Sequence, residues 1–377
     1  MIETAGYART RRTLSATAQL LSALNLDGPL LVALGLLSLY GLIILYSASG
    51  QDVNTIVRTV MRLALGAAAM LALTHAKPHF LRRIAPWLYA LGIVLLFTVA
   101  ARGVIGKGAQ RWLNLGLFRF QPSEIMKIAV PMLAAWYLRE RALPPDWKSL
   151  VVLAVIIFLP AGLVAMEPDL GTAALIAASG LLLVLMAGLS MRVILISLLL
   201  AVGAAVLGWN FMHGYQRERV LTFLNPQTDP LGAGYHIIQS QIAIGSGGVF
   251  GKGWMNGSQA QLDFLPERST DFIFSVVGEE FGLIGLLALL ALYLFVVSRC
   301  LWLAMQTNDT FSRLLSLSLG LTFFVYVFIN AGMVSGLLPV VGVPLPLVSY
   351  GGTSVVTLLA GFGILMGLYS NRKLVGS

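Results

Sequence analysis

Charged side chains lie at the ends of, or inside, long apolar stretches of this sequence, where a charge is expensive to bury. They are Arg58 and Arg62, Glu124 and Lys127, Glu167 and Asp169, and Asp271, Glu279 and Glu280. In a membrane span such a residue is a candidate functional group unless a partner explains it. Carboxylates can move protons or bind cations, and Arg and Lys suit anions such as phosphate. The pattern indicates a polar cavity.

Each candidate also has an ordinary structural explanation. Glu124 and Lys127 are three residues apart, on one helical face, and could simply neutralise each other. Asp271 directly precedes an apolar run and is well placed to cap a helix. Arg111 and Trp112 could form an interfacial anchor. Spacing alone leaves these alternatives open.

The elements that position these residues must be membrane helices. Of the 377 residues, 58% are hydrophobic and 11% are charged, and the mean hydropathy is +0.85. A water-soluble fold of this length is excluded. The apolar runs are continuous rather than alternating, which favours helices over a barrel. The net charge of +9 lies in short segments between the runs, as membrane orientation requires, so no nucleic-acid partner is expected.

About ten spans are expected from run length. They cover residues 29–48, 56–74, 86–100, 122–138, 150–166, 170–187, 193–211, 272–297, 311–332 and 345–369. Residues 1–28 form an N-terminal arm, 29–370 a single polytopic domain and 371–377 a short C-terminus. The segment from about residue 212 to 271, between the seventh and eighth spans, is predicted to be one large outer loop.

Lys and Arg are enriched in cytoplasmic loops, and this bias sets the orientation. With both termini in the cytoplasm, the inner segments hold 14 of the 25 basic residues. The short outer loops then carry four, all between the third and fourth spans: Arg102, Lys107, Arg111 and Arg119. All the candidate charged groups then face the outer side of the membrane.

Other motifs are weak. The stretch from Gly245 to Gly253 is rich in glycine but lacks the spacing of a phosphate-binding loop. The four histidines and the single Cys300 show no metal-ligand spacing.

Five ordered motifs resemble the SEDS family of shape, elongation, division and sporulation proteins. They are Gly108–Leu113 with Phe120–Lys127, Glu167–Thr172, Leu265–Phe274 and Pro344–Ser354. The resemblance extends from the first span to the tenth. Residues Gln261–Glu267 are similar to the elongation branch of the family, although Ser269 stands where many relatives have histidine.

The resemblance implies an all-α integral membrane fold of ten helices and a peptidoglycan glycosyltransferase of the bacterial cytoplasmic membrane. Such an enzyme polymerises lipid II on the outer face during cell elongation. It works with a class B penicillin-binding protein, a transpeptidase, and binds polyprenyl-diphosphate-linked glycan and membrane lipids.

In the implied reaction an acceptor C4 hydroxyl displaces a polyprenyl diphosphate with inversion. Asp271 is the expected base. Substrate-binding candidates are Arg111, Trp112, Glu124, Lys127, Asp169, Arg58, Arg62 and Arg119. A divalent cation, Mg²⁺ or Mn²⁺, is a further expectation, with Asp271 and Asp169 as its candidate ligands. Asp169 could instead hold a cationic side chain.

Two other functions remain compatible with the sequence. A lipid-linked precursor flippase would use the same cavity and basic groups without chemistry. A scaffold would only position the penicillin-binding partner.

Overall fold

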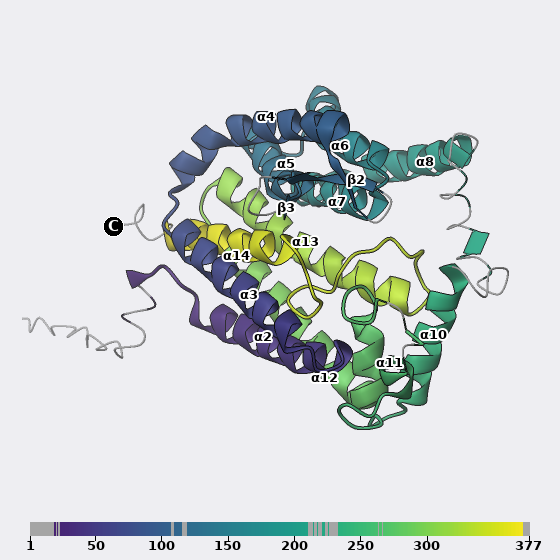
Figure 1. Cartoon of the computed structure of the whole chain (residues 1–377). Coiled ribbons are helices and arrows are strands. Elements are labelled where there is room, and N and C mark those ends of the chain that lie inside the picture. Colours follow the sequence, from purple (N-terminus) through teal and green to yellow (C-terminus); the bar gives the residue numbers. More distant parts are fainter. Residues whose placement is uncertain are drawn as a thin grey trace, which may run out of the picture.

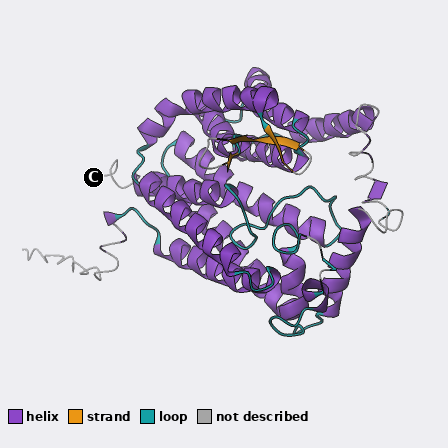
Figure 2. Ribbon diagram, viewed as in Figure 1, coloured by secondary structure: helices purple, strands orange, loops and turns teal. Residues whose placement is uncertain are grey.

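The computed structural model describes residues 19, 21, 23–106, 109–114, 119–209, 214, 217, 221, 222, 225, 233–262, 264, 265 and 267–371. This part of the chain is almost entirely helical (Figure 2). Seven of its helices are long and apolar enough to cross a membrane. They are α2 (Gly28–Ala48), α3 (Val53–Thr74), α4 (Pro78–Arg102), α6 (Trp147–Met166), α12 (Ile273–Met305), α13 (Thr310–Val334) and α14 (Ser354–Asn371). The protein is therefore a multi-pass membrane protein.

Three further helices overlap predicted spans: α5 (Ser123–Leu138), α7 (Leu170–Met186) and α8 (Met191–Gly208). Apolar side chains on the outside of the molecule suit contact with lipid. On α3, for example, Val53, Val57, Val60 and Met61 are all exposed. A soluble protein rarely exposes so continuous an apolar stripe, so this face belongs against the bilayer.

The helices form two bundles (Figure 1). In the first bundle, α12 packs on α2, and α3 packs on α14 and α2. In the second bundle, α4 packs on α5 and α6, and α7 packs on α5 and α6. Helix α13 contacts α12 of the first bundle and α5 and α7 of the second. The chain thus passes from one bundle to the other between α3 and α4, and α13 joins the two.

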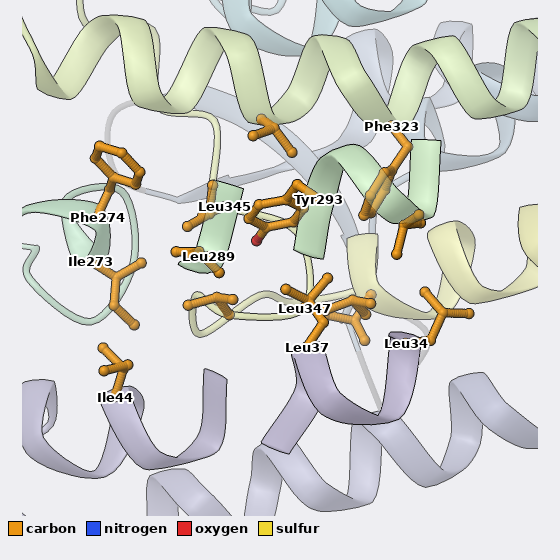
Figure 3. Close-up of a cluster of buried hydrophobic side chains, with 14 of the residues drawn as sticks. Leu34, Leu37, Ile44, Ile273, Phe274, Leu289, Tyr293, Phe323, Leu345 and Leu347 are labelled. Carbon is orange, nitrogen blue, oxygen red and sulfur yellow. The ribbon is translucent and has the colours of Figure 1, made fainter. Parts of the chain in front are cut away.

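Each bundle has its own apolar core. In the first, side chains of α2, α12 and α13 meet residues of the loop before α14, such as Leu345 and Leu347 (Figure 3). In the second, α4 to α7 surround Met126, Met132 and Ile176, and the first turns of α13 complete the core with Phe311. The two cores are separate, so the space between the bundles can be polar.

Aspartates begin several helices, because a carboxylate accepts from free backbone N–H groups of the first turn. Asp27, Asp52, Asp146, Asp169 and Asp309 are the N-caps of α2, α3, α6, α7 and α13. Two of these caps also form ion pairs. Arg299 donates to Asp27 through two nitrogens, at 2.9 and 2.7 Å, and Arg82 lies 2.6 Å from Asp309.

The segment between α4 and α5 departs from the all-α prediction. It forms three short antiparallel strands, β1 (Val104–Gly106), β2 (Ala109–Asn114) and β3 (Arg119–Phe120), in the order β1-β2-β3. This segment is too short and too polar to make another span. Pairing its backbone groups in a hairpin satisfies them and places Arg111 and Trp112 on a strand.

The predicted outer loop also contains helices, α10 (Ala233–Ser246) and the short α11 (Ser258–Gln261). Residues 247–253 lie against α12, where Gly282 interrupts the helix with a φ of 65°. Backbone N–H groups of Leu283 and Ile284 donate to Gly248 and Val249. A Cβ on Gly251 would collide with the Glu280 carbonyl. The glycine-rich stretch therefore serves close backbone packing.

Three helix boundaries differ from the predicted ones by eight residues or more. Helix α12 ends at Met305 rather than at residue 297. Helix α4 begins at Pro78 rather than at Pro86, which lies inside the helix. Helix α14 begins at Ser354 rather than at residue 345. Pro344, Pro346 and the left-handed Gly342 prevent a helix in the preceding loop, although its side chains are apolar and buried. Apolar run length could not separate this buried loop from a span.

Candidate active site between the two helical bundles

A cavity of about 740 Å³ lies between the two bundles. The first bundle contributes α3, the loop before α14 and the first turn of α14 to its walls. The hairpin contributes β2, the second bundle contributes α5 and α7, and α13 completes the walls. Six residues predicted to bind substrate line it: Arg62, Arg111, Trp112, Glu124, Lys127 and Asp169. Residues from six elements thus meet around one cavity, and several of them are charged.

Lys127 lies at the centre of a buried polar group on one wall. Its Nζ donates to Glu124 Oε1 at 2.7 Å, one turn earlier on α5, and to the hydroxyl of Tyr326 on α13 at 2.5 Å. All three side chains are buried. The second oxygen of Glu124 has no hydrogen-bond partner among the described atoms. Glu124 therefore orients the ammonium, and its second carboxylate oxygen can still accept a hydrogen bond.

Arg111 joins the hairpin to the turn between α6 and α7. Its Nη2 donates to the Pro168 carbonyl at 2.5 Å, and its Nε lies 3.6 Å from Asp169 Oδ2. Asp169 also accepts from the backbone N–H of Thr172 and from Gln121 Nε2. The structure thus places a cationic side chain beside Asp169, which was one of the two partners left open by the sequence. Arg111 is not merely an anchor at the membrane interface, since it lines the cavity.

Arg62 and Trp112 meet the loop before α14 from opposite sides. Arg62 donates to the Gly351 carbonyl at 2.9 Å and lies over the Tyr350 ring, 4.5 Å from its centre. The indole of Trp112 lies close to Gly352, where an added Cβ would come within 3.7 Å of Cη2. These contacts bring the first bundle and the hairpin together around the cavity.

Asp271 lies next to the cavity wall. It is half-buried, and a Cβ added to the wall residue Gly342 would lie 3.5 Å from Asp271 Oδ2. Its backbone carbonyl accepts from Asn330 of α13 at 2.8 Å. Helix α12 begins two residues later, at Ile273, and Phe272 rather than Asp271 occupies the N-cap position. The site and the helix start therefore lie side by side at Asp271, and the capping explanation stays open.

Glu279 and Glu280 were expected in the same cavity, and the structure places them elsewhere. Glu279 accepts from Lys252 at 2.7 Å and from the backbone of Gln259 and Ala260. Glu280 accepts a short hydrogen bond from Ser47 of α2. Both are buried carboxylates that fasten the loop before α12 to the first bundle. The sequence identifies a charge in a span, but it does not distinguish a charge that fastens two elements from a charge that lines a cavity.

The remaining predicted residues are placed as follows. Arg58 is exposed one turn before Arg62 and does not line the cavity. The side chains of Arg102 and Arg119 lie outside the described residues, as do Lys107 and Asp263.

Glu167 is buried at the end of α6, and its Oε1 has no hydrogen-bond partner among the described atoms. Burial raises the pKa of the Glu167 carboxyl to about 7, and neighbouring Asp169 adds to the effect while Arg111 opposes it. The turn thus holds a carboxyl, that of Glu167, whose pKa lies near neutral pH.

The surroundings of Asp169 bear on the expected divalent cation. The described residues contain no group of three His, Cys, Asp or Glu side chains placed to hold an ion. The oxygens of Asp169 already accept from Thr172 and Gln121, and Arg111 lies beside them. A divalent cation generally needs several free oxygens, so this carboxylate does not suit one.

Among the uncharged residues that line the cavity, two donate or accept side-chain hydrogen bonds with predicted residues and were not themselves predicted. Tyr326 bonds Lys127, and Gln121 bonds Asp169. Gln121 lies within Phe120–Lys127, one of the motifs that resemble the SEDS family, so the sequence could have indicated it. Tyr326 lies within an apolar helix, and only its place opposite Lys127 reveals it.

Fold and cavity define a polytopic membrane protein with a charged site between helices, and comparison with known proteins gives its family. The sequence profile described as "Cell cycle protein", of FtsW, RodA and SpoVE, matches residues 28–374. The chain belongs to this family, which confirms the resemblance to SEDS proteins.

Individual relatives narrow the comparison. Peptidoglycan glycosyltransferase MrdB of Escherichia coli strain K12 is 51% identical over 352 residues, which cover 93% of this chain and 95% of MrdB. A probable peptidoglycan glycosyltransferase FtsW of Trichlorobacter lovleyi is 35% identical over 92% of this chain and 94% of its own. MrdB of Escherichia coli is thus more similar to this chain than this FtsW is.

Solved structures share the fold. A chain from a peptidoglycan synthase complex that coordinates polymerization and crosslinking superposes with a TM-score of 0.81 and 31% identity, covering 92% of this chain and 98% of its own. Rod shape determining protein RodA of Thermus thermophilus superposes with a TM-score of 0.70 and 28% identity, over 92% of this chain and 97% of RodA.

Proposed function

We propose that this protein is a peptidoglycan glycosyltransferase that polymerises lipid II into glycan strands during cell elongation. One observation supports the proposal above the others. A single cavity between the bundles is lined by Arg62, Arg111 and Lys127, and the carboxylate of Asp271 lies at its wall. Positive charge for a departing diphosphate and a base for a hydroxyl proton are what such a transfer needs.

In the proposed reaction the acceptor C4 hydroxyl attacks the anomeric carbon of the donor sugar. The new C–O bond forms as the bond from that carbon to the diphosphate oxygen breaks, with inversion. Asp271 takes the hydroxyl proton, and the polyprenyl diphosphate leaves with the bonding electron pair. Arg111 and Lys127 stabilise the negative charge on the leaving group, since cationic donors fixed in a cavity need no reorganisation.

The predicted Mg²⁺ or Mn²⁺ enters the proposal only as an ion carried by the substrate. Mg²⁺ is commonly bound through phosphate oxygens together with one or two carboxylates. Asp271 is then the candidate protein ligand, and no step above depends on the ion.

The finer topology is also part of the proposal. Ten spans, with α2 first and α14 last, put residues 212–271 on the outer face between the seventh and eighth spans. Both termini, residues 1–28 and 371–377, are then cytoplasmic, and the cavity faces outward. The ion pairs of Arg299 with Asp27 and of Arg82 with Asp309 lie at the helix ends assigned to the inner face. Labelling of single cysteines at residues 5 and 375 tests this orientation.

The superposable chain from a synthase complex supports a partner as well. We propose that the partner is a class B penicillin-binding protein that crosslinks the new strands. Purification from native membranes should retrieve such a protein, and failure with and without crosslinking would count against it.

Purified protein and lipid II provide the test of function. The wild-type protein, alone or with a partner that has no glycosyltransferase domain, should yield glycan polymer. A flippase or a scaffold would yield none under the same conditions. Absence of polymer from well-folded protein with its partner would therefore reject the enzymatic proposal in favour of these alternatives.

A further inference from the structure

Residues 269–271 carry the proposed base, and the structure fixes their backbone unusually closely. Three consecutive carbonyls each accept from a residue far away in the sequence. Tyr350 N–H donates to Ser269, the Ser349 hydroxyl donates to Thr270, and Asn330 Nδ2 donates to Asp271, at 2.8, 2.5 and 2.8 Å. The loop before α14 and helix α13 therefore hold this short segment in place through its three carbonyls.

Asn330 differs from the other two donors because it holds both the base and the cavity wall. The same Nδ2 also donates to the carbonyl of Val343 at 2.8 Å. Val343 lines the cavity and follows Gly342, which approaches the Asp271 carboxylate. One amide group thus fixes the Asp271 backbone relative to the wall that its carboxylate approaches.

The orientation of this amide follows from its surroundings. Both neighbours are carbonyl oxygens, so only the NH₂ end of the Asn330 side chain can face them. The side chain is fully buried on α13, and its Oδ1 has no partner among the described atoms. Burying an unpaired acceptor is costly, and asparagine is a poor helix former. A leucine would suit this position better if packing were its only task.

We infer that Asn330 is a positioning residue for the transfer reaction, holding Asp271 in place beside the substrate cavity through its two donated hydrogen bonds. The inference rests on the proposed role of Asp271 as the base. Asn330 itself need not touch the substrate, so its loss should lower kcat rather than weaken lipid II binding. A displacement of the base by about 1 Å is enough to slow proton transfer.

Asn330→Ala removes both bonds, and Asn330→Asp keeps the size of the side chain while replacing the donors with acceptors. Both should lower kcat at least tenfold and leave the KM for lipid II within about twofold. Ser318→Ala is the matched control. It removes a buried 2.6 Å hydrogen bond from the same helix to the Ser179 carbonyl of α7. It should change thermal stability comparably and kcat less than twofold.

A double-mutant cycle separates positioning from general stability. In the Asp271→Asn background, Asn330→Ala should change the residual rate less than twofold, because no base remains to be placed. An equal loss in both backgrounds, or wild-type kcat in folded Asn330→Ala, would overturn the inference. If Asn330→Ala does not fold, Asn330→Ser, which keeps one donor, takes its place in the cycle. High activity of Asp271→Asn would instead reject the proposal that Asp271 is the base.

Discussion

Two ion pairs, each made by a buried glutamate and each with an N–O distance of 2.7 Å, lie in the two halves of this protein and have different surroundings. Glu279 of the first bundle pairs with Lys252, and Glu124 of the second pairs with Lys127. The Glu279 carboxylate also accepts from two backbone N–H groups and lies outside the cavity. The Glu124 pair lines the cavity and leaves one carboxylate oxygen unpartnered.

The comparison teaches that an intramembrane charge reveals its role through its remaining partners. A carboxylate whose acceptors are all used fastens one element to another. A pair that faces a polar cavity with spare hydrogen-bonding capacity can act on a ligand. The variants below separate these two roles.

Replacing the cavity pair should have the largest effect on activity. Lys127→Met alone would bury the Glu124 charge without its partner, which costs several kcal/mol in a low-dielectric site. The informative variant is therefore Lys127→Met with Glu124→Gln, which removes both charges. We expect it to fold and to lose about a hundredfold in kcat, as when a donor to a developing charge is removed. Lipid II polymerisation and thermal unfolding in detergent measure the two properties.

If that double variant has the stability and the activity of the wild type, Glu124 and Lys127 only neutralise each other's charge. This was the ordinary explanation suggested by the spacing of the two residues.

The corresponding change in the first bundle should affect stability instead. Glu279→Ala leaves the two backbone donors of Gln259 and Ala260 without their buried acceptor, which costs about 1–3 kcal/mol for each unsatisfied group. Lys252 is exposed and keeps its hydrogen bond to Ser258, so its charge adds little to this cost. The kcat of the folded fraction should stay within about threefold of wild type. Lys252→Met with Glu279→Gln should recover part of the stability. Complete loss of activity in fully folded Glu279→Ala would contradict the division of roles.

Arg111 should show an intermediate effect. It contacts both the Pro168 carbonyl and Asp169, and a guanidinium binds two oxygens of a phosphate where an ammonium binds as a point charge. We expect Arg111→Lys to lose about tenfold in lipid II turnover and Arg111→Ala to lose more. Wild-type rates in both folded variants would remove Arg111 from the diphosphate site.

Glu167 should show the smallest effect, and it depends on pH. Because the pKa of this carboxyl rises from 4.5 to about 7 on folding, the folded protein holds a proton that the unfolded chain releases in this range. Stability therefore falls as the pH rises from about 4.5 to 7. Glu167→Gln cannot ionise and should lose this slope, so its Tm should exceed that of wild type by a few degrees more at pH 8 than at pH 5. Parallel Tm curves for the two proteins would show that Glu167 does not titrate in this way.

Much of the cavity could be predicted from the sequence for one physical reason. A charge next to an apolar span is so costly that Arg62, Lys127 and Asp169 stand out without any structure. Arg111 stands out for a different reason, because a basic residue is unusual in a short outer loop. Tyr326 and Asn330 carry no charge, so nothing in an apolar helix marks them. The same rule included Glu279 wrongly, because it detects buried charge and cannot identify the partner.

The helices could be predicted from apolar run length, and the irregular backbone could not. The interruption of α12 at Gly282 and its pairing with residues 247–253 depend on contacts between segments distant along the chain. The buried loop before α14 is as apolar as a helix, and only its prolines and Gly342 distinguish it. Tertiary contacts decide these features.

The most direct test of the account is lipid II polymerisation by Asp271→Asn protein. Asparagine has nearly the size of aspartate and leaves the backbone carbonyl bonded by Asn330 in place, so the variant should fold and bind lipid II and its partner. It cannot accept a proton, so polymerisation should fall about a hundredfold or more. Near-normal polymer from the folded variant would contradict the account and move the base elsewhere, with Asp263, Glu267 and Asp169 as the next residues to change.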